Sequence, residues 1–237
     1  MGWIELLRFL AAVQAFLLAL AAFALSDVEA AGFTILTVAV ILLTYWRRGV
    51  AGTVALGLLF VDVTYWMAPG WISNLRHHER VAASVAPALL ATVAVCGIAT
   101  AGLRLILRPD RADRADARPA AVVVAVVLAL AAAVTLVRSG SGQSDRARPG
   151  DVTLVMHGVK FAPSALRASS AVGVEVTNHD LFWHTFTVKG KGINVRVPVG
   201  GHRRTSLNGL APGRYRFYCR IPGHESAGMK GTLVVTP

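Results

Sequence analysis

Long apolar runs with few charges occupy most of the first 137 residues, whereas shorter alternating stretches of apolar and polar residues fill the last third of the chain. An apolar helix of about 20 residues is long enough to cross a bilayer. Five runs come near this length, at residues 3–25, 31–46, 50–68, 81–107 and 120–137. The pattern predicts an N-terminal α-helical transmembrane domain of about five spans over residues 1–137.

The charges between these runs predict an orientation. The loop at residues 26–30 holds two acidic residues and no cation, whereas the next loop holds Arg47 and Arg48, and five arginines lie between Arg104 and Arg118. Basic loops stay on the cytoplasmic side. We therefore expect a multi-pass protein of the cell membrane, with its N-terminus inside and everything after residue 137 extracytoplasmic. A cleaved first run, the alternative reading, leaves the C-terminal part on the same side.

The C-terminal third has the spacing of a β-sandwich. Residues 138–150 are rich in Ser, Gly and Arg and predict a flexible linker. Residues 151–237 then form the second domain, in which short β-prone segments alternate with turn signals. These segments are residues 152–157, 172–177, 184–188, 193–198, 203–207, 214–219 and 232–236. Seven or so short strands at this spacing predict an all-β sandwich.

Cysteine count and charge narrow the class of protein. The chain has 237 residues, 54% of them apolar, and only two cysteines, which excludes a scaffold of several disulfides. Cys96 lies in an apolar run and Cys219 in the water-soluble domain, so we expect no disulfide between them. From residue 151 onward, 11 Lys and Arg stand against 4 Asp and Glu, a net charge of +7. This charge favours an acidic protein partner, because complementary charge accelerates encounter.

The strongest chemical signal is a set of copper ligands near the C-terminus. Cys219, His224 and Met229 follow one another at steps of five residues, and His184 lies 35 residues before the cysteine. Two imidazoles, one thiolate and a weak axial thioether are the ligands of a blue-copper electron-transfer site. The loop has a single cysteine, whereas a binuclear copper centre needs two, so we expect one copper ion per chain.

Residues 151–237 resemble the cupredoxins, the family of plastocyanin, azurin and auracyanin. The resemblance rests on Phe161-Ala162-Pro163, on Asn178-x-Asp180-x-x-x-His184-Thr185-Phe186 and on the Cys219-x4-His224-x4-Met229 loop. It implies a Greek-key β-sandwich with one type 1 copper, held equatorially by the two histidines and the cysteine and axially by the methionine. It also implies that the edge of the His224 ring is the electron port.

One departure from the family pattern concerns the residue after the first histidine. Many small cupredoxins have Asn there, which braces the cysteine loop, and this chain has Thr185. The rigidity of the loop and the reduction potential therefore depend on what the threonine hydroxyl can hold.

The expected function is single-electron transfer by a membrane-anchored blue copper protein. We expect no enzymatic activity of its own, although a role as redox subunit of a larger complex stays open. The expected partners are a redox protein with an acidic docking face and the lipid bilayer, and not nucleic acid. The alternative is a copper-handling protein that stores, senses or delivers the ion.

The predicted membrane part offers fewer candidates. Asp62 lies within the third span, where a carboxylate is a functional candidate unless a hydroxyl pairs with it. His77-His78-Glu79 in the following loop is either a weak metal or docking site or a solvated loop. No histidine lies within the predicted spans, which excludes bis-histidine haem between them.

Overall fold

The computed structural model describes residues 1–25, 28–46, 49–76, 81–107, 116–138 and 147–237. The chain divides into two compact units, one of residues 1–24 and 28–140 and one of residues 25–27 and 141–237. We call them the helical unit and the β unit.

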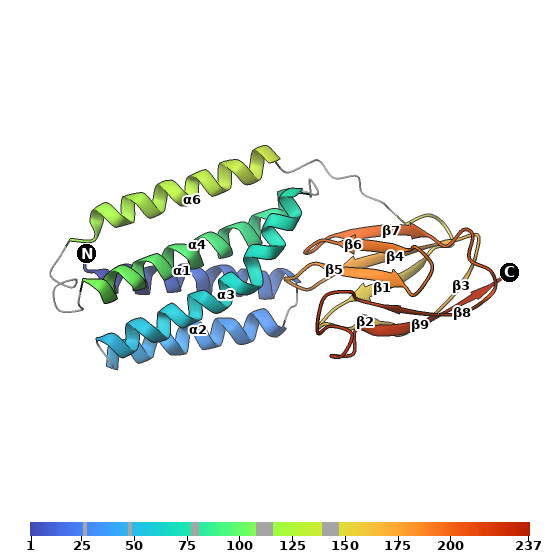
Figure 1. The fold of residues 1–237 in the computed structure, drawn as a ribbon, viewed down its shortest axis with the longest axis horizontal. Coiled ribbons are helices and arrows are strands. Elements are labelled where there is room, and N and C mark those ends of the chain that lie inside the picture. Colours follow the sequence, from blue (N-terminus) through green and yellow to red (C-terminus); the bar gives the residue numbers. More distant parts are fainter. Residues whose placement is uncertain (26–27, 47–48, 77–80, 108–115, 139–146) are drawn as a thin grey trace. The chain divides into compact units, whose positions relative to one another are not determined.

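The described part of the helical unit contains five helices (Figure 1). They are α1 (Trp3–Leu25), α2 (Val28–Trp46), α3 (Val50–Arg76), α4 (Val81–Ile106) and α6 (Arg118–Arg138). Four of them, α1, α3, α4 and α6, are long and apolar enough to cross a membrane, whereas the apolar part of α2, Ala30–Trp46, is shorter.

Helix α3 is longer than the predicted span at residues 50–68, which we ended before Pro69. The helix continues through this proline to Arg76. A proline lacks one backbone donor and disfavours the helical conformation of its predecessor, but it does not always end a helix. The turn after it is packed, since Gly70 and Asn74 are buried, and the indole nitrogen of Trp71 donates to the hydroxyl of Thr135 on α6 at 3.1 Å.

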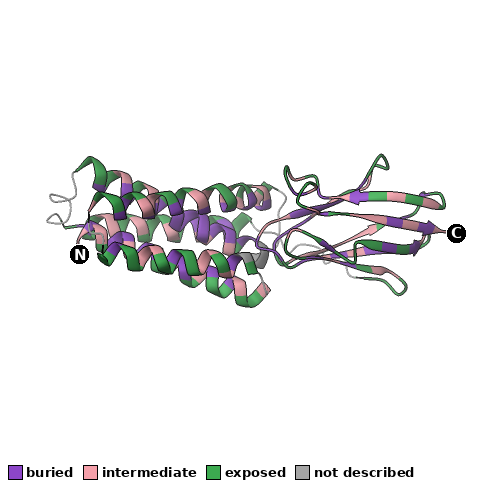
Figure 2. Cartoon of the chain, turned by 90° about the horizontal axis from the view of Figure 1, so that it is seen from below, coloured by how far each residue is buried: buried purple, intermediate pink, exposed green. Residues whose placement is uncertain are grey.

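Close packing joins α3 to α4. A Cβ atom added at Gly97 of α4 would collide with the ring of Phe60 of α3, so glycine permits this approach. Near the start of α3, the buried Arg104 side chain donates to the carbonyl of Gly49 at 3.2 Å and to the hydroxyl of Thr53. Buried residues follow the inner sides of the helices and exposed residues the outer sides (Figure 2).

The β unit consists of two sheets. The strands are β1 (Val152–Met156), β2 (Phe161–Ala162), β3 (Ala165–Ser169), β4 (Gly173–Asn178), β5 (His184–Val188), β6 (Asn194–Val197), β7 (His202–Ser206), β8 (Gly213–Tyr218) and β9 (Lys230–Thr236). One sheet has the order β2-β1-β4-β7 and the other β3-β9-β8-β5-β6. The pairs β1/β4 and β3/β9 are parallel and the remaining pairs antiparallel.

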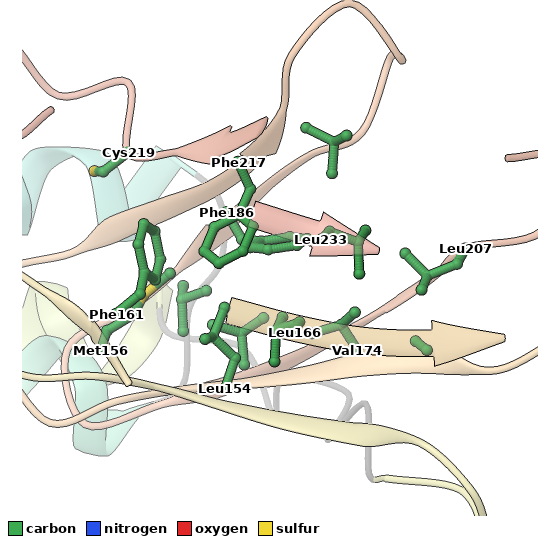
Figure 3. Packing of buried hydrophobic residues seen from close by; sticks show 14 of the residues in the cluster. Leu154, Met156, Phe161, Leu166, Val174, Phe186, Leu207, Phe217, Cys219 and Leu233 are labelled. Carbon is green, nitrogen blue, oxygen red and sulfur yellow. The ribbon is translucent and has the colours of Figure 1, made fainter. Parts of the chain in front are cut away.

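A single apolar core lies between the two sheets (Figure 3). Leu154 and Val176 come from the first sheet, and Phe186, Phe217 and Leu233 from the second, and all five are fully buried. The rings of Phe186 and Phe217 lie 5.3 Å apart between centroids. Aromatic residues of this size contribute most of the stabilisation of such a core. The core fixes the sheets that carry the site.

Seven strands lie at the predicted places, and their ends differ from the predicted ends by at most two residues. Strands β2 and β3 were not predicted. Strand β2 has only two residues, and Pro163 follows it directly. Strand β3 alternates exposed and buried residues, with Leu166 and Ala168 in the core. Its sequence contains few large apolar side chains, so it has no clear β-prone pattern. Its parallel pairing with β9 depends on contacts that are distant in sequence.

Candidate metal centre

The predicted ligands come from three neighbouring chain segments at one end of the second sheet. His184 begins β5, Cys219 follows β8 directly, and Met229 directly precedes β9. The antiparallel register of β8 and β9 pairs Tyr218 with Lys230, so Cys219 and Met229 come next to each other. The backbone N–H of Cys219 donates to the carbonyl of Met229 at 3.1 Å. The loop between these two residues carries His224.

Three donor atoms converge. The Nδ1 atoms of His184 and His224 lie 3.2 Å apart, and the sulfur of Cys219 lies 3.9 Å from the first and 3.7 Å from the second. His184 is 0% exposed, Cys219 1% and His224 9%. Among the described residues, these three form the group of histidine, cysteine and acidic side chains that could hold a metal ion.

Backbone hydrogen bonds shape the loop that brings His224 back to the cysteine. The N–H of His224 donates to the carbonyl of Ile221 at 3.1 Å, and its own carbonyl accepts from Met229 at 2.9 Å. Gly223 and Gly228 have φ angles of 86° and 106°, in the left-handed region that glycine adopts without a steric penalty. These two glycines therefore permit the turns on either side of the histidine.

Thr185 braces the cysteine loop through its hydroxyl and its backbone. The Oγ1 atom accepts a hydrogen bond from the N–H of Arg220 at 2.8 Å, and the backbone N–H lies 3.4 Å from the sulfur of Cys219. The hydroxyl of Thr187 lies 3.3 Å from that of Thr185 and 2.7 Å from Oδ1 of Asn194. The threonine hydroxyl therefore holds the backbone of the residue that follows the cysteine.

The far side of the His184 ring contacts a buried carboxylate. Nε2 of His184 lies 2.8 Å from Oδ2 of Asp180, which is 3% exposed. A carboxylate accepts but does not donate, so Nε2 carries the proton and Nδ1 offers its lone pair to the other donor atoms. The sequence motif contained Asp180, but only as part of the resemblance, and its contact with the histidine was missed.

The electrostatics of the cluster favour a thiolate. Burial opposes the charged form of Cys219, but contacts with His184, His224 and the backbone N–H of Thr185 outweigh it and lower the pKa to about 6 from 9.0. Burial likewise opposes the charged form of His184, but its hydrogen bond to Asp180 and the nearby sulfur raise its pKa. A thiolate is the form of cysteine that binds metals.

The other predicted residues are placed as follows. Met229 is fully buried, with its backbone joined to Cys219 and His224. His77, His78 and Glu79 lie outside the described residues. Asp62 is half-buried on α3, and the neighbouring hydroxyl of Thr64 donates to the carbonyl of Phe60 at 2.8 Å.

The donor atoms fit a metal ion in size and chemistry. A point equidistant from the two nitrogens and the sulfur lies about 2.1 Å from each, which is within the bond lengths of zinc to imidazole and thiolate, about 2.0–2.3 Å. Two imidazoles and one thiolate in a trigonal arrangement suit copper, because the site then serves both of its oxidation states.

Comparison with known proteins identifies the β unit. Residues 121–235 match the family model of the cupredoxin-like domain, which leaves residues 1–120 outside it. Auracyanin-B of Chloroflexus aurantiacus is 67% identical over 27 residues, which are 11% of this chain and 12% of that protein.

Several solved structures of auracyanins and of a plastocyanin also match. Auracyanin B matches with 22% identity over 41% of this chain and 96% of its own, with a TM-score of 0.33. Auracyanin from Roseiflexus castenholzii matches with 16% identity over 39% and 100%, also at 0.33, and plastocyanin from Dryopteris crassirhizoma with 23% identity over 36% and 100%, at 0.30. Residues 121–235 thus match a cupredoxin-like domain, and within them His184, Cys219 and His224 form a candidate copper site.

Proposed function

We propose that this chain is a membrane-anchored type 1 copper protein that transfers single electrons on the extracytoplasmic side. The observation that carries the proposal is the convergence of Nδ1 of His184, Nδ1 of His224 and the sulfur of Cys219 within a cupredoxin-like domain. One bound copper ion would supply a Cu(II)/Cu(I) couple that accepts and donates one electron. Met229 is proposed as the axial ligand.

The protein's part in this function is to hold the donor atoms in place. Cys219 and Met229 are joined by a backbone hydrogen bond beyond the paired ends of β8 and β9, and His184 starts the adjacent β5. Thr185 fixes the backbone of Arg220. Donors held by strand ends move little between oxidation states, which keeps the reorganisation that opposes electron transfer small.

His224 is the proposed electron port. It is the most exposed of the three donor residues, at 9% against 0% for His184 and 1% for Cys219. Arg220 and Lys230, near either end of the cysteine loop, are exposed. These cations and the net charge of +7 from residue 151 onward support docking of a redox partner through an acidic face.

We also propose the membrane topology inferred from sequence: residues 1–137 as a bundle of five spans with the N-terminus inside, 138–150 as a linker, and 151–237 as an extracytoplasmic Greek-key sandwich. Four long apolar helices support membrane association. Cupredoxins are generally electron carriers, which fits a protein without catalysis of its own.

Redox titration of the copper-loaded full chain in detergent tests the function. An electron carrier shows an intense visible thiolate-to-copper band that disappears and returns reversibly with one electron, with copper retained throughout. Loss of copper to a Cu(I) chelator upon reduction, with no return of the band on reoxidation, would instead support the copper-handling alternative. A colourless copper-loaded chain would contradict the type 1 site itself.

A further inference from the structure

We propose that Asp180 is a positioning residue of this centre, whose carboxylate holds the proton on Nε2 of His184 and so presents Nδ1 to the metal. The inference rests on the proposed function and extends it, because it assigns a role to a residue outside the four proposed ligands. With this carboxylate in place, the reduction potential of the bound copper should be lower than the same ligands would give without it.

The carboxylate of Asp180 is fully engaged. Oδ2 accepts from Nε2 of His184 at 2.8 Å and from the N–H of Val159 at 3.0 Å, while Oδ1 accepts from the N–H of Gly158 at 2.7 Å. Nδ1 of the half-exposed His157 lies 3.5 Å from Oδ1. Asp180 is 3% exposed, so these groups replace water around both oxygens. Every one of these hydrogen-bonding groups donates to the carboxylate oxygens, which is the environment that suits an ionised carboxylate.

The turn that holds this carboxylate has an unusual backbone. Gly158 and Val159 have φ angles of 58° and 55°, and Val159 is the one non-glycine residue with positive φ in the described chain. A β-branched residue rarely adopts this conformation. Consecutive N–H groups can form a concave anion-binding nest, and here both point at Asp180. Strain of this kind persists where surrounding contacts hold it, and it is found at functional sites.

The other side of Asp180 is fixed as well. Its own N–H donates to Oδ1 of Asn178 at 2.9 Å, and the amide nitrogen of Asn178 donates to the carbonyls of Phe182 at 2.5 Å and Pro198 at 3.1 Å. The carboxylate thus lies in a rigid frame between the turn after β1 and the first residue of β5. Such a frame sets both the orientation and the tautomer of the His184 ring.

Two chemical consequences follow for the metal. First, a histidine that donates one ring N–H to a carboxylate binds metal through the other nitrogen with raised basicity. Second, a buried anion beside the ligand stabilises the higher positive charge of Cu(II) more than that of Cu(I). A purely structural carboxylate would only hold the turn at residues 157–160, and its neutralisation would leave the metal's preference unchanged.

The test compares Asp180→Asn with Asp151→Asn in the copper-loaded full chain in detergent. Asp151 is the matched control, because it is a buried carboxylate that also accepts two backbone N–H groups, from Arg148 and Gly173, but it pairs with Arg204 rather than with a ligand. We expect Asp180→Asn to lower the preference for Cu(II) over Cu(I) about tenfold, a rise in midpoint potential of about 59 mV, and the control to leave it unchanged. Equal potentials in the wild type and Asp180→Asn, or equal shifts in the two variants, would overturn the proposal.

A second measurement needs neither copper nor a variant that folds. Nitrogen-15 NMR of the metal-free wild-type chain, at a pH where His184 is neutral, should show the ring proton on Nε2 and a bare Nδ1. A proton on Nδ1 would overturn the role of Asp180. Failure of the proposed function would look different, because the wild type itself would then lack the visible band on copper loading, while this tautomer would still be found.

Discussion

The two units of this chain differ in their exposed apolar side chains: in the described chain, the exposed large apolar residues all lie in the helical unit. In the helical unit, Phe23, Trp46 and Val137 are 87%, 92% and 84% exposed, while Gln14 and Arg104 are buried. In the β unit, Phe186, Phe217 and Leu233 are buried and eight of the eleven cations from residue 151 onward are exposed. Apolar side chains turned outward are what a helical bundle surrounded by lipid requires, and apolar side chains turned inward are what a domain in water requires.

The difference extends to the chemistry of the two free cysteines. Both are buried, Cys96 at 7% exposure and Cys219 at 1%. Cys96 lies in an apolar helix, whereas Cys219 lies between two imidazoles and a backbone N–H. Burial alone therefore does not prepare a thiol to bind a metal ion. The imidazole and backbone nitrogens beside Cys219 make the difference.

The largest expected effect comes from replacing each cysteine in turn. Cys219→Ser should abolish the visible charge-transfer band completely, because the thiolate is one partner of that transition. Cys96→Ser should leave the band at full intensity per copper. The measurement is the absorption spectrum of each copper-loaded variant, with copper determined separately. A band that survives in Cys219→Ser would place the thiolate elsewhere.

Core truncation should separate the two environments. Phe217→Ala removes a fully buried ring from the β unit and should lower the free energy of unfolding of that unit by about 3–5 kcal/mol. Phe23→Ala removes a ring of the helical unit that is 87% exposed and should leave the free energy of unfolding of the β unit unchanged. Amide hydrogen exchange along β8 in the full chain reports both values. Equal protection in the two variants would refute the assigned core.

A charge on the outer face of a helix tests whether that face meets lipid. Leu130 is 60% exposed near the middle of α6. Leu130→Asp should disfavour membrane insertion by about 2.5–3.5 kcal/mol, because aspartate is costly at the centre of a span. Leu130→Phe is the control and should insert normally. Insertion is followed by protease protection in membranes, and normal insertion of the aspartate variant would argue against a lipid-facing α6.

A pH-dependent effect is expected at the buried ion pair of the β unit. Arg204 donates to both carboxylate oxygens of Asp151, at 2.6 Å and 2.9 Å, and this hydrogen bonding holds the pKa of Asp151 well below its ordinary value. Asp151→Asn should therefore cost about 1.5–3 kcal/mol at neutral pH. A depressed folded-state pKa gives stability above the unfolded pKa, which is lost as the pH falls, so the difference should shrink below about pH 4. Urea unfolding at several pH values measures it, and a difference independent of pH would contradict the ion pair.

The smallest expected effect concerns the brace on the cysteine loop. Thr185→Val removes the acceptor of the Arg220 N–H and should cost about 1 kcal/mol locally, which speeds exchange of that amide about fivefold. Thr187→Val leaves the acceptor in place and removes only a hydroxyl that contacts Asn194 and the Thr185 hydroxyl, so it should speed that exchange less. Equal rates in the two variants would show that the threonine hydroxyl does not hold the loop.

The sequence predicted most of this molecule wherever the signal was local. The apolar runs predicted the helices, and the alternating segments predicted seven of the nine strands. The steps from Cys219 to His224 and Met229 predicted the neighbourhood of the site, because a loop between two antiparallel strands has to return to the same edge. His184 followed from the same pattern, and in the structure its ring lies beside Cys219 and His224.

What could not be predicted depends on contacts between distant segments. Strand β3 is recognisable only through its pairing with β9, 67 residues later, and the last turn of α3, beyond Pro69, is packed. Asp180 contacts a turn at Gly158 in which Val159 has a positive φ angle. The backbone preferences of valine disfavour this conformation, so the sequence does not indicate the turn. The bracing role of Thr185 could not be predicted either, because it depends on the position of the backbone N–H of Arg220.

X-ray absorption at the copper edge of the loaded full chain tests the central claim most directly. The account predicts one copper per chain with one short bond to sulfur and two bonds to imidazole nitrogen, from Cys219, His184 and His224. Two short sulfur bonds, or a first shell of nitrogen and oxygen without sulfur, would contradict it.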